Sequence, residues 1–261
     1  MCLQNEVIQL YIKKLFKFNS NLFFMKLTER KKLHDDLLIR LHTLYDDIRG
    51  NVDEFIYDGP SDWELYYKSK PRILFLLKES WGSHHPSQQG LKINTKHMIN
   101  LARWKIAIEN KINNKPCIFL KRESLPANLD DVARVEIKKI NTESKLSSNS
   151  DIKKYAINDK DFLREQIELI NPQIIICCGG SQLILDCYDI IFENHIKNEK
   201  KISDSVWLSN NRIVLDFYHP STPPSYIESD TDVDVQCYEK LVGLLSNDSV
   251  KDAIAWVMSQ E

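Results

Sequence analysis

Two polar clusters in this sequence carry residue types that could cleave a bond in a substrate. Glu79 follows the apolar run 73–77, and His219 follows the largely apolar run 212–217. A carboxylate can hold or deprotonate an attacking water, and a histidine can donate to an oxygen that gains negative charge. Glu79 and His219 are therefore the candidate catalytic pair. Alternatively, Glu79 forms an ion pair with Lys78 or lies at a helix N-terminus. His219, which is followed by Pro220, could likewise do no more than end a strand.

These runs are typical of strands that are buried on both faces of a parallel sheet. We predict strands over 72–77, 131–139, 173–178 and 212–217, with helices between them. This alternation favours an α/β fold, a three-layer sandwich around a four-stranded, mainly parallel sheet. Ligands of such sheets bind beyond the carboxyl ends of the strands, so the polar residues at these ends should meet in one crevice.

The segment before the first strand has helical periodicity. Leucines from Leu33 to Leu44 recur on one helix face, and Gly50 is a natural C-terminal stop. We expect two helices, with a break near 18–21. The predicted division is an N-terminal helical extension over 1–50 and one α/β domain over 51–261.

Composition limits the setting and the partners. The six cysteines show no paired CxxC spacing, and no apolar stretch approaches the roughly 20 residues of a membrane-spanning helix. We expect a reduced, cytoplasmic protein without a membrane partner, and neither a metal nor an organic cofactor. With a net charge of −2, nucleic-acid binding would depend on a local basic patch. The candidates for that patch are Lys138, Lys139, Lys145, Lys153 and Lys154.

The order of the strand ends resembles the uracil-DNA glycosylase superfamily over roughly residues 70 to 225. The family's first motif, of Gly-Glu-Ala-Pro-Gly type, carries the carboxylate that acts on water and matches Lys78-Glu79-Ser80-Trp81-Gly82. Lys78 replaces the leading glycine and Trp81 replaces the proline. The late motif His219-Pro220-Ser221 matches without change. The resemblance implies the glycosylase fold and DNA as the partner.

Base recognition is expected to differ from that of the family. Glu136 stands where the resemblance implies a base-reading asparagine. An ionised carboxylate only accepts hydrogen bonds, which favours a base with an exocyclic amino group over plain uracil. Alternatively, Glu136 pairs with Arg134 or a neighbouring lysine and reads nothing. Ser80 and Trp81 are expected beside the extruded base, where Trp81 stacks on it or packs in the core.

Further residues are expected to contact DNA. The Gly-Gly-Ser turn after the third strand offers N–H groups for a phosphate, or is a plain strand-to-helix turn. The residues after the histidine lie where the family carries its duplex-penetrating loop, and Pro223, Pro224 and Tyr226 are the candidates for a wedge. Alternatively, this segment is only a stiff exposed turn. The full DNA-contacting set is Lys138, Lys139, Gly179, Gly180, Ser181, Pro220, Ser221 and Tyr226.

The sequence thus favours a monofunctional DNA glycosylase that flips a base, including modified bases, out of DNA and hydrolyses its N-glycosidic bond. Its setting would be DNA repair or phage defence against foreign DNA. The alternative is a catalytically inactive nucleic-acid or nucleotide-binding module of the same fold, because the first motif lacks its glycine and proline. A third hypothesis is an interaction module whose N-terminal helices dock a partner.

Overall fold

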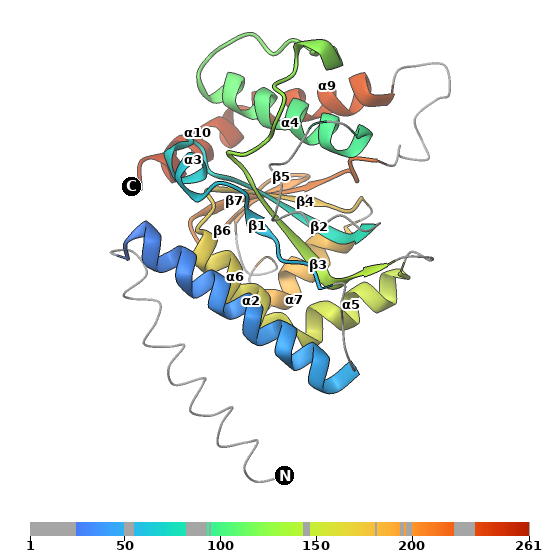
Figure 1. Cartoon of the computed structure of the whole chain (residues 1–261). Coiled ribbons are helices and arrows are strands. Elements are labelled where there is room, and N and C mark those ends of the chain that lie inside the picture. The colour runs from blue at the N-terminus through green and yellow to red at the C-terminus, as the bar shows by residue number, and fades with distance from the viewer. Residues whose placement is uncertain are drawn as a thin grey trace.

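The computed structural model describes residues 25–49, 55–81, 93, 95–142, 147–180, 182–193, 196, 200–221 and 233–260. One mixed sheet of seven strands lies between two layers of helices, in the order β1-β3-β2-β4-β7-β6-β5 (Figure 1). The strands are β1 (Gly59–Pro60), β2 (Ile73–Trp81), β3 (Ala133–Thr142), β4 (Ile174–Cys178), β5 (Lys200–Ser203), β6 (Val206–Ser209) and β7 (Arg212–Phe217). The α/β class is confirmed.

The expected four-stranded sheet is wrong in strand number. The four predicted strands are present as the parallel neighbours β3, β2, β4 and β7. Three further strands widen the sheet, because β1 pairs antiparallel with β3 and the β5-β6 hairpin pairs antiparallel with β7. The added strands lie at the edges, so the carboxyl ends of the parallel strands still meet side by side.

Helices cover both faces of the sheet (Figure 1). One face carries α4 (Lys96–Ile112), α9 (Val233–Ser246) and α10 (Asp248–Met258), and the other carries α2 (Leu27–Arg49), α5 (Asn149–Asn158), α6 (Lys160–Ile170) and α7 (Leu183–Ile191). The short helices are α3 (Trp63–Lys68) and the 3-10 turn Arg122–Ser124. Ile73, Phe75 and Leu77 pack into the α4-side core, whereas Leu74 and Leu76 pack into the other. This alternation explains why β2 is apolar from Ile73 to Leu77.

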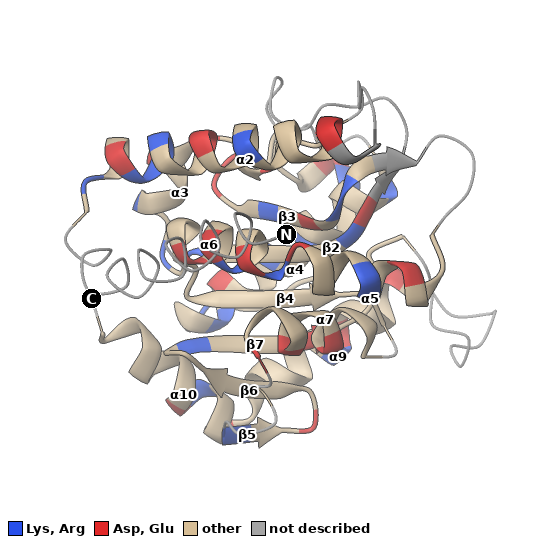
Figure 2. Ribbon diagram, turned by 90° about the horizontal axis from the view of Figure 1, so that it is seen from below, with Lys and Arg blue, Asp and Glu red and all other residues tan. Residues whose placement is uncertain are grey.

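The predicted second N-terminal helix is confirmed as α2. It packs on α6, where Leu37 and Leu169 share a small core and Arg30 Nη1 donates to Leu169 O at 3.2 Å. Basic and acidic residues are interspersed along α2 (Figure 2), as on the solvated side of an amphipathic helix. The predicted first helix lies outside the described residues, and the domain boundary near 50 stays a prediction. Among the described helices, none has the length and apolar character needed to cross a membrane.

Candidate functional site

The sheet register brings the candidate residues to one edge. Leu77 of β2 is level with Glu136 of β3 and with Cys178 of β4, and Cys178 is level with Phe217 of β7. Glu79 and His219 each follow this row by two residues. His219 therefore lies beyond the end of β7. Glu79, paired with Lys138, is still inside β2 but lies past the level at which β4 ends, near the edge where open α/β sheets bind their ligands.

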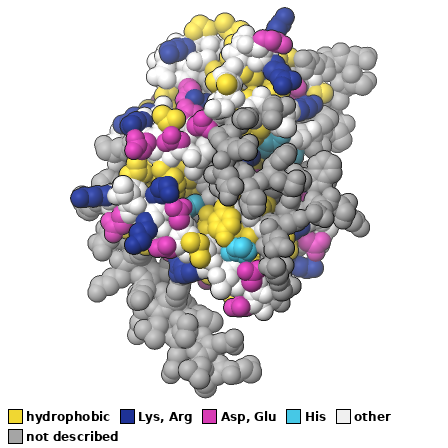
Figure 3. Space-filling view, in the orientation of Figure 1, with side chains coloured by type: hydrophobic (Ala, Val, Ile, Leu, Met, Phe, Trp, Pro, Cys, Tyr) yellow, Lys and Arg dark blue, Asp and Glu magenta, His cyan; other side chains and the backbone are white. Residues whose placement is uncertain are grey.

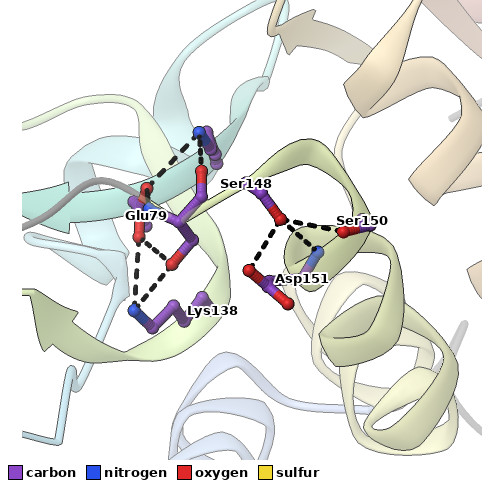
Figure 4. A network of polar contacts seen from close by, with 7 residues as sticks. Glu79, Lys138, Ser148, Ser150 and Asp151 are labelled. Carbon is purple, nitrogen blue, oxygen red and sulfur yellow. Dashed lines mark hydrogen bonds and ion pairs between the residues drawn. The ribbon is translucent and has the colours of Figure 1, made fainter.

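Glu79 is held by a cage of polar contacts (Figure 4). Its Oε1 accepts from Ser147 N at 2.9 Å, and its Oε2 accepts from Ser147 Oγ at 2.7 Å and from Lys138 Nζ at 3.3 Å. Lys78 Nζ lies 3.5 Å from Oε1, so the alternative in which Glu79 pairs with Lys78 is confirmed. With its side chain 1% exposed, the Glu79 carboxylate is occupied by these partners rather than by solvent.

The two lysines near Glu136 in β3 have different partners. Lys138 lies beside Glu79, whereas Lys139 is fully buried, with Nζ 2.7 Å from both carboxylate oxygens of Asp58. Gln166 Nε2 also donates to Asp58, at 2.7 Å. The prediction that Lys139 contacts DNA is therefore wrong, because side-chain alternation along β3 turns it into the core.

Glu136 is a buried carboxyl group with an unused oxygen. The residue is 4% exposed, and its Oε2 is buried with no hydrogen-bond partner among the residues that the structure describes. Burial raises the pKa of Glu136 to about 7, against the opposing effect of the Arg134 charge. Near pH 7 the raised pKa favours the neutral acid far more than in an ordinary glutamate, and the neutral acid offers one O–H donor and one carbonyl acceptor. The assumption of a fully ionised carboxylate, made from the sequence, needs this correction.

Arg134 lies two residues before Glu136 on the same face of β3. Its Nε is buried without a hydrogen-bond partner, and its Nη1 lies 3.6 Å from the sulfur of Met98. The Arg134 side chain is half-buried. Burial is the main reason why the pKa of Arg134 is lowered. Within the described part of the chain, neither Arg134 nor a lysine forms an ion pair with Glu136, so the pairing alternative is not supported. Glu136 Oε2 and Arg134 Nε thus have no hydrogen-bond partner among the described residues, and both side chains lie on the α4 side of the sheet.

His219 is held as a neutral donor. Its Nδ1 accepts a hydrogen bond from Ser221 N at 3.2 Å, so in the neutral ring Nε2 carries the hydrogen. Burial, and then the Lys78 charge, lower the pKa of His219. The ring centroid of His97 lies 5.8 Å away, and burial lowers the pKa of His97 to about 3. Neither ring needs to be charged for His219 to present an N–H.

The turn that carries His219 is bound to α4 and α9. Asn100 Nδ2 donates to Pro220 O at 2.8 Å and to Asp234 Oδ1 at 3.1 Å, and Arg103 Nη1 donates to Asn100 Oδ1 at 3.2 Å. Pro220 is consequently buried, which contradicts its expected contact with DNA, while Ser221 is exposed. The role of Asn100 in holding this turn was not predicted from the sequence. The available signal was polar residues at i, i+3 and i+6 on a helix with an apolar face.

The Gly-Gly turn after β4 is a structural turn. A Cβ on Gly179 would lie 2.3 Å from Ile184 Cγ1, and Gly180 has a left-handed φ of 61°. The N–H groups of Gly179 and Gly180 both donate to Phe217 O, at 3.3 and 3.0 Å. Their expected use by a DNA phosphate is therefore wrong, and the plain-turn alternative holds. Ser181, Tyr226 and the side chains of Ser80 and Trp81 lie outside what the structure describes, so those predictions stay predictions.

A pocket of about 390 Å³ lies beside the Glu79 cage, between the end of β3 and α5. Figure 3 shows positive and negative side chains mixed over the described part of one face of the molecule. In the described residues no group of three His, Cys, Asp or Glu side chains could hold a metal ion. The pocket lining is Lys138, Ser147, Asp151, Lys154, Tyr155 and Asn158.

Comparison of the sequence with protein-family models and with curated proteins finds no match. The resemblance to the uracil-DNA glycosylase superfamily therefore depends on the residues at the strand ends alone. The chemistry open to this site follows from its own geometry.

Proposed function

We propose that this protein is a monofunctional DNA glycosylase that hydrolyses the N-glycosidic bond of a base flipped out of DNA. The observation that carries the proposal is Glu136, a buried carboxyl group whose pKa is raised to about 7 and whose Oε2 has no hydrogen-bond partner in the described part of the chain. Burying a polar group without a hydrogen bond is costly, and such groups cluster at functional sites. This one lies at the ligand-binding edge of the sheet.

Glu136 suits the edge of a nucleobase. In its neutral form it can donate to a carbonyl and accept from a ring N–H, as uracil and hypoxanthine require, or pair with N3 and the amino group of cytosine. In its ionised form it can only accept, which leaves bases with an N–H or amino group and opposes a nearby carbonyl. Recognition of uracil-like bases would thus require the protonated form. This widens the substrate range expected from the sequence, where uracil was disfavoured.

In the proposed reaction Glu79 orients the attacking water and accepts its proton, while the bond from C1′ to the base nitrogen breaks. The electron pair of that bond leaves with the base. His219 Nε2–H stabilises the resulting negative charge at a base carbonyl, as a neutral donor. Because Ser147 and Lys138 occupy Glu79 in the structure, DNA binding must exchange these contacts before the carboxylate can act.

Mass spectrometry of free bases tests the proposal. Oligonucleotides that contain uracil, hypoxanthine or a modified cytosine are incubated with the full chain. Release of a free base by the wild type, lost in Glu79→Gln and His219→Ala variants that still bind DNA, supports it. Release of no base from any of these DNAs refutes it. Repair and defence against phage DNA would use the same chemistry and differ in the base released.

A second candidate is a nucleic-acid-binding module of this fold without catalysis. The observation that favours it is the Glu79 cage, where a side chain that is 1% exposed is already bound by Ser147 and Lys138. In that case the Glu79→Gln variant binds DNA as the wild type does, and neither protein releases a base.

A further inference from the structure

The pocket beside the Glu79 cage has two walls of different origin. Asp151, Lys154, Tyr155 and Asn158 follow i, i+3, i+4 and i+7 spacing, so one face of α5 forms the first wall. Lys138 from the end of β3 and Ser147 form the second. The volume of about 390 Å³ lies within the range of small-molecule sites.

The charged groups at this pocket favour an anion. Lys154 Nζ and Ser148 Oγ bind the carboxylate of Asp151, at 3.3 and 2.6 Å, which reduces the repulsion it exerts on an incoming negative charge. Lys138 Nζ also lies 5.7 Å from the centre of the Tyr155 ring, which supplies a flat aromatic wall. Cations outnumber anions in and directly behind the lining. They are the cations Lys78, Lys138 and Lys154 and the anions Glu79 and Asp151.

The pocket shares two of its groups with the Glu79 cage. Lys138 Nζ lies 3.3 Å from Glu79 Oε2 and donates to Ser147 Oγ at 2.9 Å, and Ser147 Oγ donates to Glu79 Oε2 at 2.7 Å. An anion in the pocket would compete with the Glu79 carboxylate for both donors. Lys78 would remain beside Glu79, because its Nζ contacts Oε1 on the other oxygen.

We propose that this pocket binds a phosphate group of a nucleic-acid strand through Lys138, Lys154 and Ser147 Oγ, and that binding draws Lys138 and Ser147 away from Glu79. An aromatic ring beside two lysines suits a phosphate with an adjoining base. The binding site stands on the pocket alone, whereas the release of Glu79 as a water-activating group rests on the proposed glycosylase function. The inference couples occupation of the strand site to the freeing of the carboxylate.

Binding is tested with the full chain and two probes, inorganic phosphate and a single-stranded oligonucleotide. Lys154→Met is the test variant, because the Lys154 side chain is 70% exposed and its loss should not unfold the protein. The structure takes Lys153 out of the basic patch considered from the sequence, because Lys153 pairs with Asp186 outside the pocket lining. Lys153→Met is therefore the matched control. Amide NMR titration should show phosphate-dependent shifts at Ser147, Tyr155 and Asn158.

Lys154→Met should weaken oligonucleotide binding by about tenfold and lower the slope of log K against log salt by about one, and Lys153→Met should change neither. Equal effects of the two variants would overturn the site. Dependence on Lys154 for inorganic phosphate but not for the oligonucleotide would overturn the strand assignment.

The two proposals can fail separately. If no DNA releases a base while the oligonucleotide binds through Lys154, the glycosylase proposal fails and the phosphate site stands. If bases are released and Lys154→Met alters neither release nor binding, the phosphate site fails and the glycosylase stands. For the coupling, the side-chain carboxyl ¹³C signal of Glu79 should shift on oligonucleotide binding in the wild type and in Lys153→Met. A signal that stays unchanged while the pocket is occupied would overturn the coupling.

Discussion

Lys139 and Asp58 form an ion pair inside the protein, with Lys139 Nζ 2.7 Å from both carboxylate oxygens and the lysine fully buried. The pair joins β3 to the chain segment just before β1. If one member of such a pair is removed, the other is left as an uncompensated buried charge. The resulting loss of stability is larger than the net stability that the intact pair contributes.

Lys139→Met should therefore lower the free energy of unfolding by about 3–5 kcal/mol, measured by urea denaturation. Lys200→Met, at an exposed position of β5, is the control and should change it by less than about 0.5 kcal/mol. A small effect of Lys139→Met would mean that the buried pair does not form in solution.

Glu136 should make the stability of the protein fall as pH rises. Its folded pKa of about 7 lies above the reference value of 4.5, so between these values the folded state holds a proton that the unfolded state has released. Glu136→Gln removes this penalty. The variant should gain stability relative to wild type from pH 4.5 upward and reach about 2–4 kcal/mol above pH 7. Denaturation curves of both proteins at pH 5 and pH 8 measure it, and a constant difference between them would contradict the assignment.

Base release should depend on pH through the same group. Under the proposed function, protonated Glu136 reads a uracil-like edge and ionised Glu136 does not. Single-turnover release of uracil should therefore fall between pH 6 and pH 8.5, whereas the Glu136→Gln variant should lose this dependence because an amide keeps donor and acceptor at every pH. An identical pH profile for the two enzymes would show that Glu136 does not read the base.

His219 should act through its N–H rather than through a positive charge. His219→Ala should lower kcat by about 10²–10³-fold, the usual cost of removing one donor to a developing anion. His219→Gln, which keeps an N–H at similar reach, should retain more activity than the alanine variant. Measurement of kcat and of DNA affinity separates the two roles. Equal losses in both variants would indicate that the ring only fills space.

Asn100 should position the turn that carries His219. Without its amide, Pro220 O loses a buried donor, so Asn100→Ala should destabilise the protein by about 1–3 kcal/mol. At a temperature where the variant is folded, kcat should fall while DNA affinity stays within about twofold. Asn113→Ala, at the exposed C-terminal end of α4, is the control. Unchanged kcat in the folded Asn100→Ala variant would contradict the positioning role.

The central part of the fold could be predicted because its strands carry apolar runs, as in β2 and β4, or apolar residues at alternate positions, as in β3. The strands corresponding to β2, β3, β4 and β7 and most of the long helices were found from such patterns. The strands β1, β5 and β6 were missed, since two to four residues carry too little pattern. A usable signal was Asn210-Asn211, whose φ values of 48° and 59° suit the turn between β6 and β7. The start of helix α5 is hard to predict, because its first residues, Asn149, Ser150 and Asp151, are polar and are also typical of a loop.

The errors at the site have similar causes. Lys139 was expected at a strand end, but β3 continues to Thr142, so Lys139 has the same inward parity as Val135 and Ile137. Ser147 could not be linked to Glu79 from the sequence, since 68 residues separate them. The raised pKa of Glu136 depends on how completely its neighbours exclude water, which only the packed structure determines.

The backbone of Glu136 is held by a hydrogen bond to Asp58. Its N–H donates to Asp58 Oδ2 at 2.6 Å, while the side chain faces α4 on the opposite surface of the sheet. Asp58, together with Lys139 and Gln166, therefore helps to fix the backbone from which the Glu136 carboxyl group projects on the other side of the sheet. Under the proposed function, a substitution of Asp58 should alter base preference through this backbone contact while every side chain proposed to touch the base is kept.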